Sequence, residues 1–358
     1  MLTTIIFIIV LAILIFVHEL GHFITARFAG IRVDAFKLGF GPKIISWKKG
    51  ETEYGVNLIP FGGYVKIHGE NPDEESVSGP DLARSFVNKP RWKQVIVLVA
   101  GVFFNFLFAW LLYISAFLSG VTATTDGFEK YSQDFSNSRV MITYLSTDSP
   151  AENAGLVVGD IIENSNDVET IQQMINDSHG SSIKLSIKHQ QESRSVEIVP
   201  IQGIVNDKYA IGIAMQKVAD LRLSLFSAIW EGLHYTLIMI RETVVGLYTF
   251  VVNIFQGTAN FSDVAGPIGI AGIVGSAAYL GFTYLLMITA LISINLGVIN
   301  LIPFPALDGG RTLFVLIEGV IRRRISMRFT NIVNTIGFIL LMLLMVVVTY
   351  KDIVKSVK

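Results

Sequence analysis

The sequence lacks cysteine entirely and carries little charge. Of its 358 residues, 16% are charged and the net charge at pH 7 is −1, whereas soluble globular proteins contain about 25% charged residues. Without cysteine, the chain cannot form disulfide bonds or bind a metal through thiolates. Because the net charge is close to zero, no overall field attracts nucleic acid, and we expect no nucleic-acid partner.

Apolar residues are concentrated in four long segments: residues 2–17, 95–118, 284–301 and 332–348. Each approaches the length of about 20 residues that a helix needs to cross the hydrocarbon core of a bilayer. The first segment has neither a basic start nor a small-residue cleavage site, so it predicts a retained membrane helix rather than a signal peptide. We therefore expect a polytopic α-helical membrane protein with about four transmembrane helices in contact with the lipid bilayer.

The positions of Lys and Arg predict the orientation of these helices. Arg27, Lys37, Lys89 and Lys93 lie close to the ends of the first two apolar segments, and a second basic cluster spans residues 311–329. Lys and Arg near membrane helices favour the cytoplasmic side. We therefore place both basic segments in the cytoplasm, and the acidic segment 120–220 and both termini outside.

Residues 221–283 are harder to assign, because the apolar stretch 225–255 contains Glu231, Arg241 and Glu242. Such charges favour amphipathic helices on the outer membrane surface, although two further crossings are the alternative. The predicted order is transmembrane helix 1–27, cytoplasmic and re-entrant segment 28–94, transmembrane helix 95–119, outer domain 120–220, surface helices 221–283, transmembrane helix 284–310, basic cytoplasmic segment 311–329, transmembrane helix 330–350 and outer tail 351–358.

Residues 34–68 are unusually apolar for a cytoplasmic loop. Two apolar stretches flank the turn at 48–51, and glycines interrupt both, at 39–42 and 61–64. This pattern predicts a β-hairpin, and its apolar character predicts that the hairpin enters the membrane against the helices. The alternative is a loosely folded loop. We hypothesise that Gly62, Gly63, Tyr64 and Val65 hold a substrate as an added strand.

The outer segment 120–220 predicts a small α/β domain. Alternating apolar residues predict strands at 139–145, 182–187, 195–200 and 209–213, and a helix is expected at 168–178. Residues 149–160 resemble the signature of PDZ domains of bacterial envelope proteases. The resemblance implies a domain that binds peptides, including peptide C-termini, as an added strand. An inert β-rich spacer is the alternative.

The sequence His18-Glu19-Leu20-Gly21-His22 contains the clearest chemical signal. On a helix, His18 and His22 project from the same face and can share one metal ion. Glu19 lies about 100° further round, where it can act as a general base on a metal-activated water. Zn²⁺ suits nitrogen and oxygen ligands of this kind. The alternative is a set of polar residues at a helix end, but such residues are costly in a membrane segment without a site.

A catalytic zinc site needs a third protein ligand. Pro303, Pro305 and the Gly309-Gly310 pair cannot continue the third transmembrane helix, so the chain unwinds at its cytoplasmic end. The predicted topology brings His18 and His22 to this same end of the membrane. We therefore predict Asp308 as the third ligand, and Asn300 as a residue that binds substrate backbone or the developing oxyanion.

These motifs together resemble the site-2 protease family of intramembrane zinc metalloproteases. The matching elements are His18-Glu19-x-x-His22, Gly101-x-x-x-Asn105, Asn300-x-x-Pro303, Leu307-Asp308-Gly309, Gly39-Phe40-Gly41-Pro42 and Ala265-Gly266-Pro267-Ile268-Gly269. With an outer PDZ domain, the resemblance extends over essentially the whole chain to the bacterial RseP-type subgroup. Many members of that subgroup carry two PDZ domains, whereas segment 120–220 has room for one, so gating by paired domains need not apply here.

The resemblance implies cleavage within the transmembrane segments of single-span membrane proteins. Implied substrates are anti-sigma factors that another protease has already trimmed outside the cell membrane, and leftover signal peptides. The PDZ domain would exclude untrimmed substrates by size or bind new C-termini. The implied location is the bacterial inner membrane, with the PDZ domain in the periplasm and the active site toward the cytoplasm.

Three other functions fit parts of the sequence. A zinc or ion transporter would distribute ionisable residues over several transmembrane helices, whereas here they gather at one end. A membrane-anchored protease for soluble chains would carry its motif outside the bilayer, whereas His18 follows 16 apolar residues directly. A non-catalytic PDZ scaffold would have no need for the intact Glu19. The protease hypothesis is therefore favoured.

Overall fold

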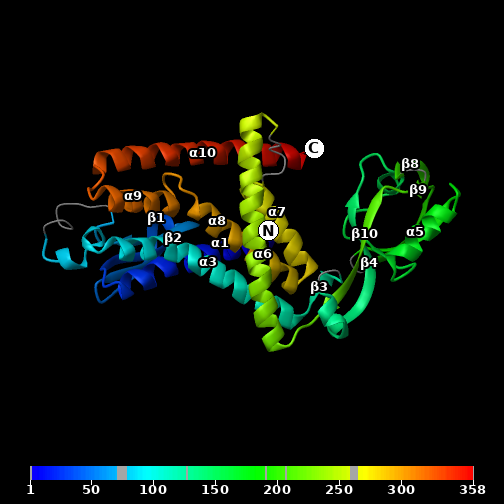
Figure 1. The fold of residues 1–358 in the computed structure, drawn as a ribbon, viewed down its shortest axis with the longest axis horizontal. Helices are drawn as coiled ribbons and strands as arrows, with labels where there is room; N and C mark the ends of the chain where they lie inside the picture. Colours follow the sequence, from blue (N-terminus) through cyan, green and yellow to red (C-terminus); the bar gives the residue numbers. More distant parts are fainter. Residues whose placement is uncertain are drawn as a thin grey trace. The chain divides into compact units, whose positions relative to one another are not determined.

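The computed structural model describes residues 2–70, 79–125, 128–189, 192–205, 208–258 and 265–357. The chain forms two compact units (Figure 1). One unit comprises Met1–Ser115 and Ile229–Lys358, and the other comprises Ala116–Ala228.

Five helices in the described part of the chain are long and apolar enough to cross a membrane. They are α1 (Leu2–Phe28), α3 (Arg91–Ser119), α6 (Leu225–Gln256), α8 (Phe282–Leu301) and α10 (Met327–Val357). Four of them contain the four predicted apolar segments. By length and composition α6 is a fifth candidate beside the four predicted, because its charged residues do not interrupt the helix and are spaced among many apolar residues.

The direction of α6 differs from that of the other long helices. In Figure 1, α6 (yellow-green) runs across the direction of α1, α3, α8 and α10. It contacts α3 and α8 where it crosses them: Tyr235 packs edge-on against Tyr113 of α3 at 4.9 Å between ring centroids, and Thr243 donates a hydrogen bond to Asn295 of α8 at 3.0 Å. A helix on a membrane surface must cross the spanning helices in this way, so the surface placement of 221–283 remains our prediction. Residues 259–264 of that segment lie outside the described residues.

Small residues allow α1 and α8 to approach α3 closely. A side-chain carbon on Gly21 of α1 would lie 2.5 Å from the carbonyl oxygen of Ala100 on α3, and one on Gly297 of α8 would lie 2.6 Å from the ring of Phe106. Membrane helices commonly pack through such residues. Two shorter helices complete the unit: α7 (Pro267–Leu280), which contacts α1 and α8, and α9 (Asp308–Ile321), which follows α8.

The predicted hairpin is present as two long antiparallel strands, β1 (Val33–Lys49) and β2 (Thr52–Ile67). Residues 33–38 of β1 pair on one side with 63–67 and on the other with 53–56, which also pair with 45–49. Two bent strands therefore make a sheet four segments wide. Gly39 and Gly41, at φ +81° and +83°, supply the bend that L-residues rarely adopt. Segment 63–67 forms one edge of this sheet.

The second unit is an antiparallel sheet with helices. Its strand order is β3 (Val121–Thr124), β10 (Ile213–Leu221), β4 (Phe135–Leu145), β5 (Ile161–Ile162), β6 (Ile183–His189) and β7 (Glu192–Ile198). The pair β8 (Ile201–Val205) and β9 (Lys208–Ala210) lies apart from this sheet. The core includes Ile142, Ile162 and Leu185, all fully buried. Helix α5 (Val168–Asp177) is capped by Asp167, whose carboxylate accepts a hydrogen bond from the Thr170 amide.

Short helical segments occupy the connections. They are 3₁₀ turns at η1 (Leu82–Arg84), η2 (Phe86–Asn88) and η3 (Glu129–Asp134), and the single turn α4 (Pro150–Asn153). The first two lie between the hairpin and α3, where the backbone of Phe86 donates a hydrogen bond to His68. This bond fixes the start of α3 against the end of β2.

Candidate metal centre

Helix α1 places His18 and His22 on one face, one turn apart. Both residues are buried, with 8% and 7% of their surface exposed. The rings meet edge to face with centroids 4.8 Å apart, and their Nε2 atoms are 3.2 Å apart. The spacing of four residues produces this arrangement directly, because residues i and i+4 lie above one another on a helix.

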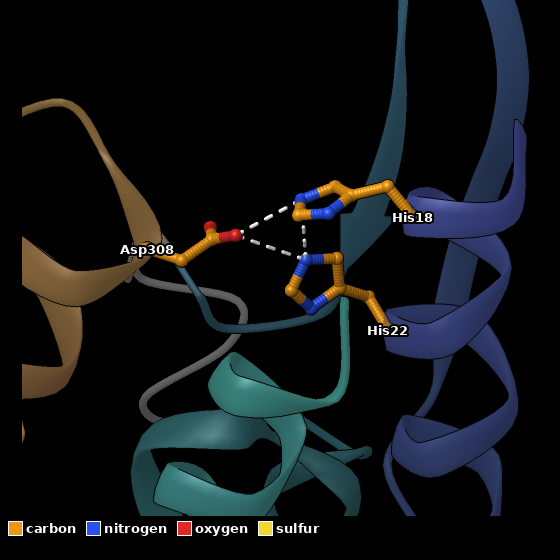
Figure 2. A group of neighbouring side chains, drawn as sticks. All are labelled: His18, His22 and Asp308. Atoms are coloured by element: carbon orange, nitrogen blue, oxygen red, sulfur yellow. Dashed lines mark hydrogen bonds and ion pairs between the residues drawn. The ribbon is translucent and has the colours of Figure 1, made fainter. Parts of the chain in front are cut away.

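Asp308 reaches the two histidines from a distant part of the chain. Helix α8 ends at Leu301, and Asp308 is the first residue of α9. Its Oδ2 lies 3.0 Å from Nε2 of His18 and 3.2 Å from Nε2 of His22 (Figure 2). One ligand atom from each residue lies within 4.8 Å of the others. The structure therefore brings the three predicted ligands together.

The turn before Asp308 is tightly built. Ala306 adopts φ +74°, and its amide donates a hydrogen bond to the Asn334 side chain of α10. A side-chain carbon on Gly309 or Gly310 would lie 2.3 Å or 2.2 Å from a backbone oxygen of the loop that precedes it. Only glycine fits at these two positions, so the segment that presents Asp308 is held close to the end of α8.

The outer ring nitrogens decide whether Nε2 is free to bind a metal. Nδ1 of His22 lies 2.8 Å from the carbonyl oxygen of Val97. A carbonyl can only accept, so Nδ1 of His22 carries the hydrogen and Nε2 keeps its lone pair. Backbone carbonyls commonly orient metal-binding histidines in this way. His22 therefore fits a metal site without rearrangement.

Asn105 of α3 plays the same part for His18. It is fully buried, its side-chain amide lies 3.1 Å from Nδ1 of His18, and its Oδ1 has no partner in the described part of the chain. The oxygen and nitrogen of an amide exchange places by a half-turn about the terminal bond. With Oδ1 toward the ring, Asn105 accepts the Nδ1 hydrogen, its orphaned oxygen is satisfied, and Nε2 of His18 is free. These residues fit zinc.

Gly101 lies one helical turn before Asn105 on the same face of α3. A side-chain carbon there would lie 2.4 Å from Nε2 of His22 and 2.7 Å from Cε1 of His18. Any larger residue would push into the space between the two rings. The family motif Gly101-x-x-x-Asn105 predicts no role for either residue by itself; the spacing of four residues is the signal that both face one partner.

Glu19 lies between the histidine pair and the edge of the hairpin sheet. A side-chain carbon on Gly63 would lie 3.5 Å from Cγ of Glu19 and 3.0 Å from Ile15. Gly63, a member of the predicted strand clamp, thus lies next to Glu19; Tyr64 and Val65 follow on the same sheet edge, and Gly62 immediately precedes it. Asn300 lies in the last turn of α8, on the chain that leads to Asp308.

A polar cavity of about 500 Å³ lies between the end of β2 and α9. Its lining includes Tyr64, Lys66, Glu70 and Arg311. Burial raises the pKa of the Glu70 carboxyl, and the nearby Arg311 guanidinium, with which it forms an ion pair, opposes that rise. This pair joins the end of the hairpin to the helix that carries Asp308.

Comparison with known proteins decides the family. Residues 6–344 match the model described as Peptidase family M50. The chain belongs to this family. One relative, named "Putative zinc metalloprotease" in Clostridium perfringens, is 36% identical over 349 residues, which cover 95% of each chain. Zinc metalloprotease RasP of Geobacillus kaustophilus is 30% identical over 431 aligned positions, covering 98% of this chain and 97% of the relative.

This M50 peptidase is therefore a zinc metalloprotease of the site-2 protease type, with Zn²⁺ as its cofactor. Its general activity is intramembrane proteolysis, and its apolar helices embed it in a membrane. The predicted resemblance to site-2 proteases is confirmed. Membership also favours the protease over the transporter and the scaffold.

Proposed function

We propose that this protein hydrolyses a peptide bond within the transmembrane segment of single-span membrane proteins, with His18, His22 and Asp308 as zinc ligands and Glu19 as the general base. The carrying observation is the convergence of three ligand atoms within 4.8 Å of one another, two from a long apolar helix. The histidines are buried, so the site lies within the packed helices and not on a free surface.

Each residue near the centre has a definite task in this proposal. Zn²⁺, when bound, supplies a Lewis acid that polarises the scissile carbonyl and makes water acidic enough to attack. Glu19 accepts the proton of the attacking water and passes a proton to the leaving amine. Asn300 donates a hydrogen bond to the oxygen of the carbonyl under attack.

The free edge at 63–67 supports binding of the substrate as an extended strand. An amide inside a transmembrane helix is hidden by its own hydrogen bonds, so the helix must unwind before cleavage, and the released backbone groups need partners in the membrane. Segment 63–67 pairs with β1 on one side, and its other side is open among the described segments of the sheet. A substrate strand added there would lie beside Glu19.

The direction of this edge predicts the orientation of the substrate. Gly63 adjoins Ile15 and Glu19, whereas Val65 and Ile67 belong to the buried cluster that contains Ala26, further along α1, so 63–67 runs in the same direction as α1. An added antiparallel strand would run opposite to α1. With the C-terminal end of α1 in the cytoplasm, as the basic residues predict, the substrate would have a cytoplasmic N-terminus. Anti-sigma-factor-like proteins trimmed on the outside, and remnant signal peptides, are the proposed substrates.

The second unit has a site for another added strand, in keeping with a PDZ-type domain. The ladder between β10 and β3 covers only Val218–Leu221, so the β3 side of Ile213–Gln216 is not paired in it. Ile213 and Met215 pack against the same buried core as Met174 of α5, and α5 contacts β10, which places an apolar helix face near this edge. We propose that the unit lies in the periplasm of a bacterial inner membrane, with the metal centre toward the cytoplasm, and that it binds peptide C-termini or excludes untrimmed substrates.

The proposed reaction is tested with purified full-length protein in detergent and a tagged single-span substrate. Wild type, Glu19→Gln and the control Glu242→Gln, which alters an exposed carboxylate on α6, are compared for cleavage and bound zinc. We expect Glu19→Gln to retain zinc and lose cleavage by at least about 100-fold, and Glu242→Gln to match wild type. Cleavage by Glu19→Gln at the wild-type rate would contradict the role of Glu19. Absence of zinc from the wild type would contradict the ligand set.

A further inference from the structure

The polar cavity between β2 and α9 follows the open edge of the hairpin sheet. Its volume is about 500 Å³, and its wall consists of residues 64–70, of Arg32 and Asp34 at the start of β1, and of Arg311 of α9. Residues 64–67 belong to the edge at which a substrate strand would add. Such a strand would therefore pass along this cavity, and the wall would contact its side chains.

Lys66 is the charged residue of this wall that has no partner. The other charged side chains lie in ion pairs: Nε of Arg32 lies 2.8 Å from Oδ1 of Asp34, and Arg311 pairs with Glu70. Lys66 is exposed and forms no ion pair within the described part of the chain. The wall therefore carries one positive charge that is not balanced.

His68 provides a second unsatisfied group in the same wall. It follows Lys66 by two residues, and its backbone N–H donates to the carbonyl of Arg32 at 2.9 Å, so Lys66 and His68 lie on one face of the strand. The residue is 6% exposed, and its Nε2 has no hydrogen-bond partner among the described residues. Its Nδ1 lies 3.7 Å from Asp34, too far for a hydrogen bond, so Nε2 is able to carry the ring hydrogen and donate it.

We propose that this cavity binds an acidic side chain of the substrate, which pairs with Lys66 and accepts a hydrogen bond from Nε2 of His68. An ionised carboxylate suits both partners, because it is negatively charged and only accepts hydrogen bonds. A basic side chain would be repelled by Lys66, and an apolar one would leave the buried Nε2 unpaired. The subsite rests on the proposed function, since it requires substrate to bind as a strand at 63–67.

The register of the edge predicts where the acidic residue lies in the substrate. In an added antiparallel strand, one substrate residue lies opposite each edge residue, in reverse order. Gly63 lies beside Glu19, and Lys66 follows Gly63 by three residues. The acidic residue should therefore precede the substrate residue at Glu19 by about three positions. It would lie toward the end of the membrane segment, where a charge costs less than at the bilayer centre.

Disulfide cross-linking identifies the substrate residue that lies beside position 66. The chain contains no cysteine, so Lys66→Cys in full-length Glu19→Gln protein introduces a single thiol. It is combined in detergent with a tagged single-span substrate that carries one cysteine at successive positions of its cytoplasmic half. We expect cross-linking to peak at one position, and Lys49→Cys, at the exposed tip of the hairpin, not to share that peak. No cross-link to position 66 would overturn the subsite.

Binding of substrates with Asp, Asn or Lys at the cross-linked position then tests the charge. Affinity for full-length Glu19→Gln protein is measured with each version. We expect Asp to bind roughly fivefold more tightly than Asn, and Lys to bind less tightly than Asn. Lys66→Glu should reverse this order, whereas the control Lys49→Glu should keep it. Equal affinity of the three versions, or an order that Lys66→Glu leaves unchanged, would overturn the subsite.

Two further comparisons separate hydrogen bonding from charge and the subsite from the reaction. His68→Gln keeps a side-chain donor and should retain more of the Asp preference than His68→Leu. With Glu19 intact, cleavage of the three versions at equal kcat/KM would overturn the subsite and leave the proposed reaction standing. An Asp preference in binding, with no version cleaved, would support the subsite and contradict the proposed reaction.

Discussion

Two of the open β edges in the described structure differ in what stands beside them. Segment 63–67 of β2 adjoins Glu19 and the buried histidine pair, in a sheet bent by glycine. Residues 213–216 of β10 lie in a unit with a conventional hydrophobic core, against which Ile213, Met215 and apolar residues of α5 all pack. Either edge can hold a peptide through its backbone. Only the first can present the peptide to a base and a metal, so the neighbours of an edge decide whether binding leads to chemistry.

Proline substitution at the two edges should produce the largest difference in cleavage rate between them. Consecutive residues of a strand direct their N–H groups to opposite sides, so of Tyr64→Pro and Val65→Pro, one removes a donor from the open edge and the other a bond to β1. We expect the edge variant to retain zinc and to lose roughly 100-fold or more in cleavage rate, because a misplaced scissile bond costs about that much.

The matched variants at β10 are Ala214→Pro and Met215→Pro. For a short, already trimmed substrate we expect less than about a threefold change in cleavage rate, because the second edge contributes binding and no chemistry. Both rates and bound zinc are measured with the same tagged substrate. Full activity of both hairpin variants with zinc retained would remove 63–67 from the substrate path.

A smaller effect is expected from Asn105, which sharpens the assignment of the metal centre beside the first edge. Asn105→Leu leaves the Nδ1 hydrogen of His18 without an acceptor, and we expect zinc affinity to fall by about 10- to 100-fold. Asn105→Asp keeps an acceptor and should stay within a few-fold of wild type. Affinity is measured by competition with a chelator, and the His18 tautomer by nitrogen NMR.

Thr289→Val is the control for Asn105, since it also removes a buried polar group, one that bonds only to its own helix. It should not change zinc affinity. Tight zinc binding by Asn105→Leu would show that His18 is oriented by something else. A loss in Asn105→Asp equal to that in Asn105→Leu would indicate a packing role instead of a hydrogen bond.

The smallest effect concerns the stability of the second unit. Burial raises the pKa of Asp220, but hydrogen bonds from Arg139, Asn137 and Thr122 outweigh it and hold that pKa below its usual value. The stabilisation is therefore present above about pH 4, the ordinary pKa of aspartate, and is lost as the pH falls further. Asp220→Asn should cost roughly 0.5–1 kcal/mol at pH 7 and less at pH 3.

This difference is measured by hydrogen exchange of the β4 and β10 amides in the full-length protein. Glu192→Gln, at an exposed position of β7, is the control and should have no effect at either pH. An equal cost of Asp220→Asn at pH 7 and pH 3 would mean that the charge of Asp220 contributes nothing.

Much of the metal centre and of the hairpin can be predicted from local sequence patterns. The four-residue spacing of His18 and His22 fixes their common face, and the proline and glycine pairs around Asp308 fix the break after α8. The turn at Gly50 likewise ends one strand and begins the next. Each of these features depends on residues within one or two turns of chain, and such patterns can be recognised without knowing the fold.

Other features depend on contacts between distant residues. The double pairing of 33–38 arises because glycines bend both strands back on themselves, and no alternation of apolar residues encodes that register. The role of Asn105 requires the distance between α1 and α3, which Gly21 and Gly101 set by their lack of side chains. For α6, the apolar content favours a membrane-spanning helix and the charged residues favour a surface helix. The sequence therefore does not predict the orientation of α6, which is seen only in its contacts with Tyr113 and Asn295.

The double pairing of β1 also has a mechanical consequence. Residues 33–38 are bonded on both sides to the same strand, β2, so 63–67 cannot slide along its neighbour without also disturbing 53–56. A pull along a strand added at this edge would load all rows of the sheet in shear at the same time. The hairpin is therefore a stiff anchor, and tension on a substrate chain would stretch that chain before it deforms the edge that holds it.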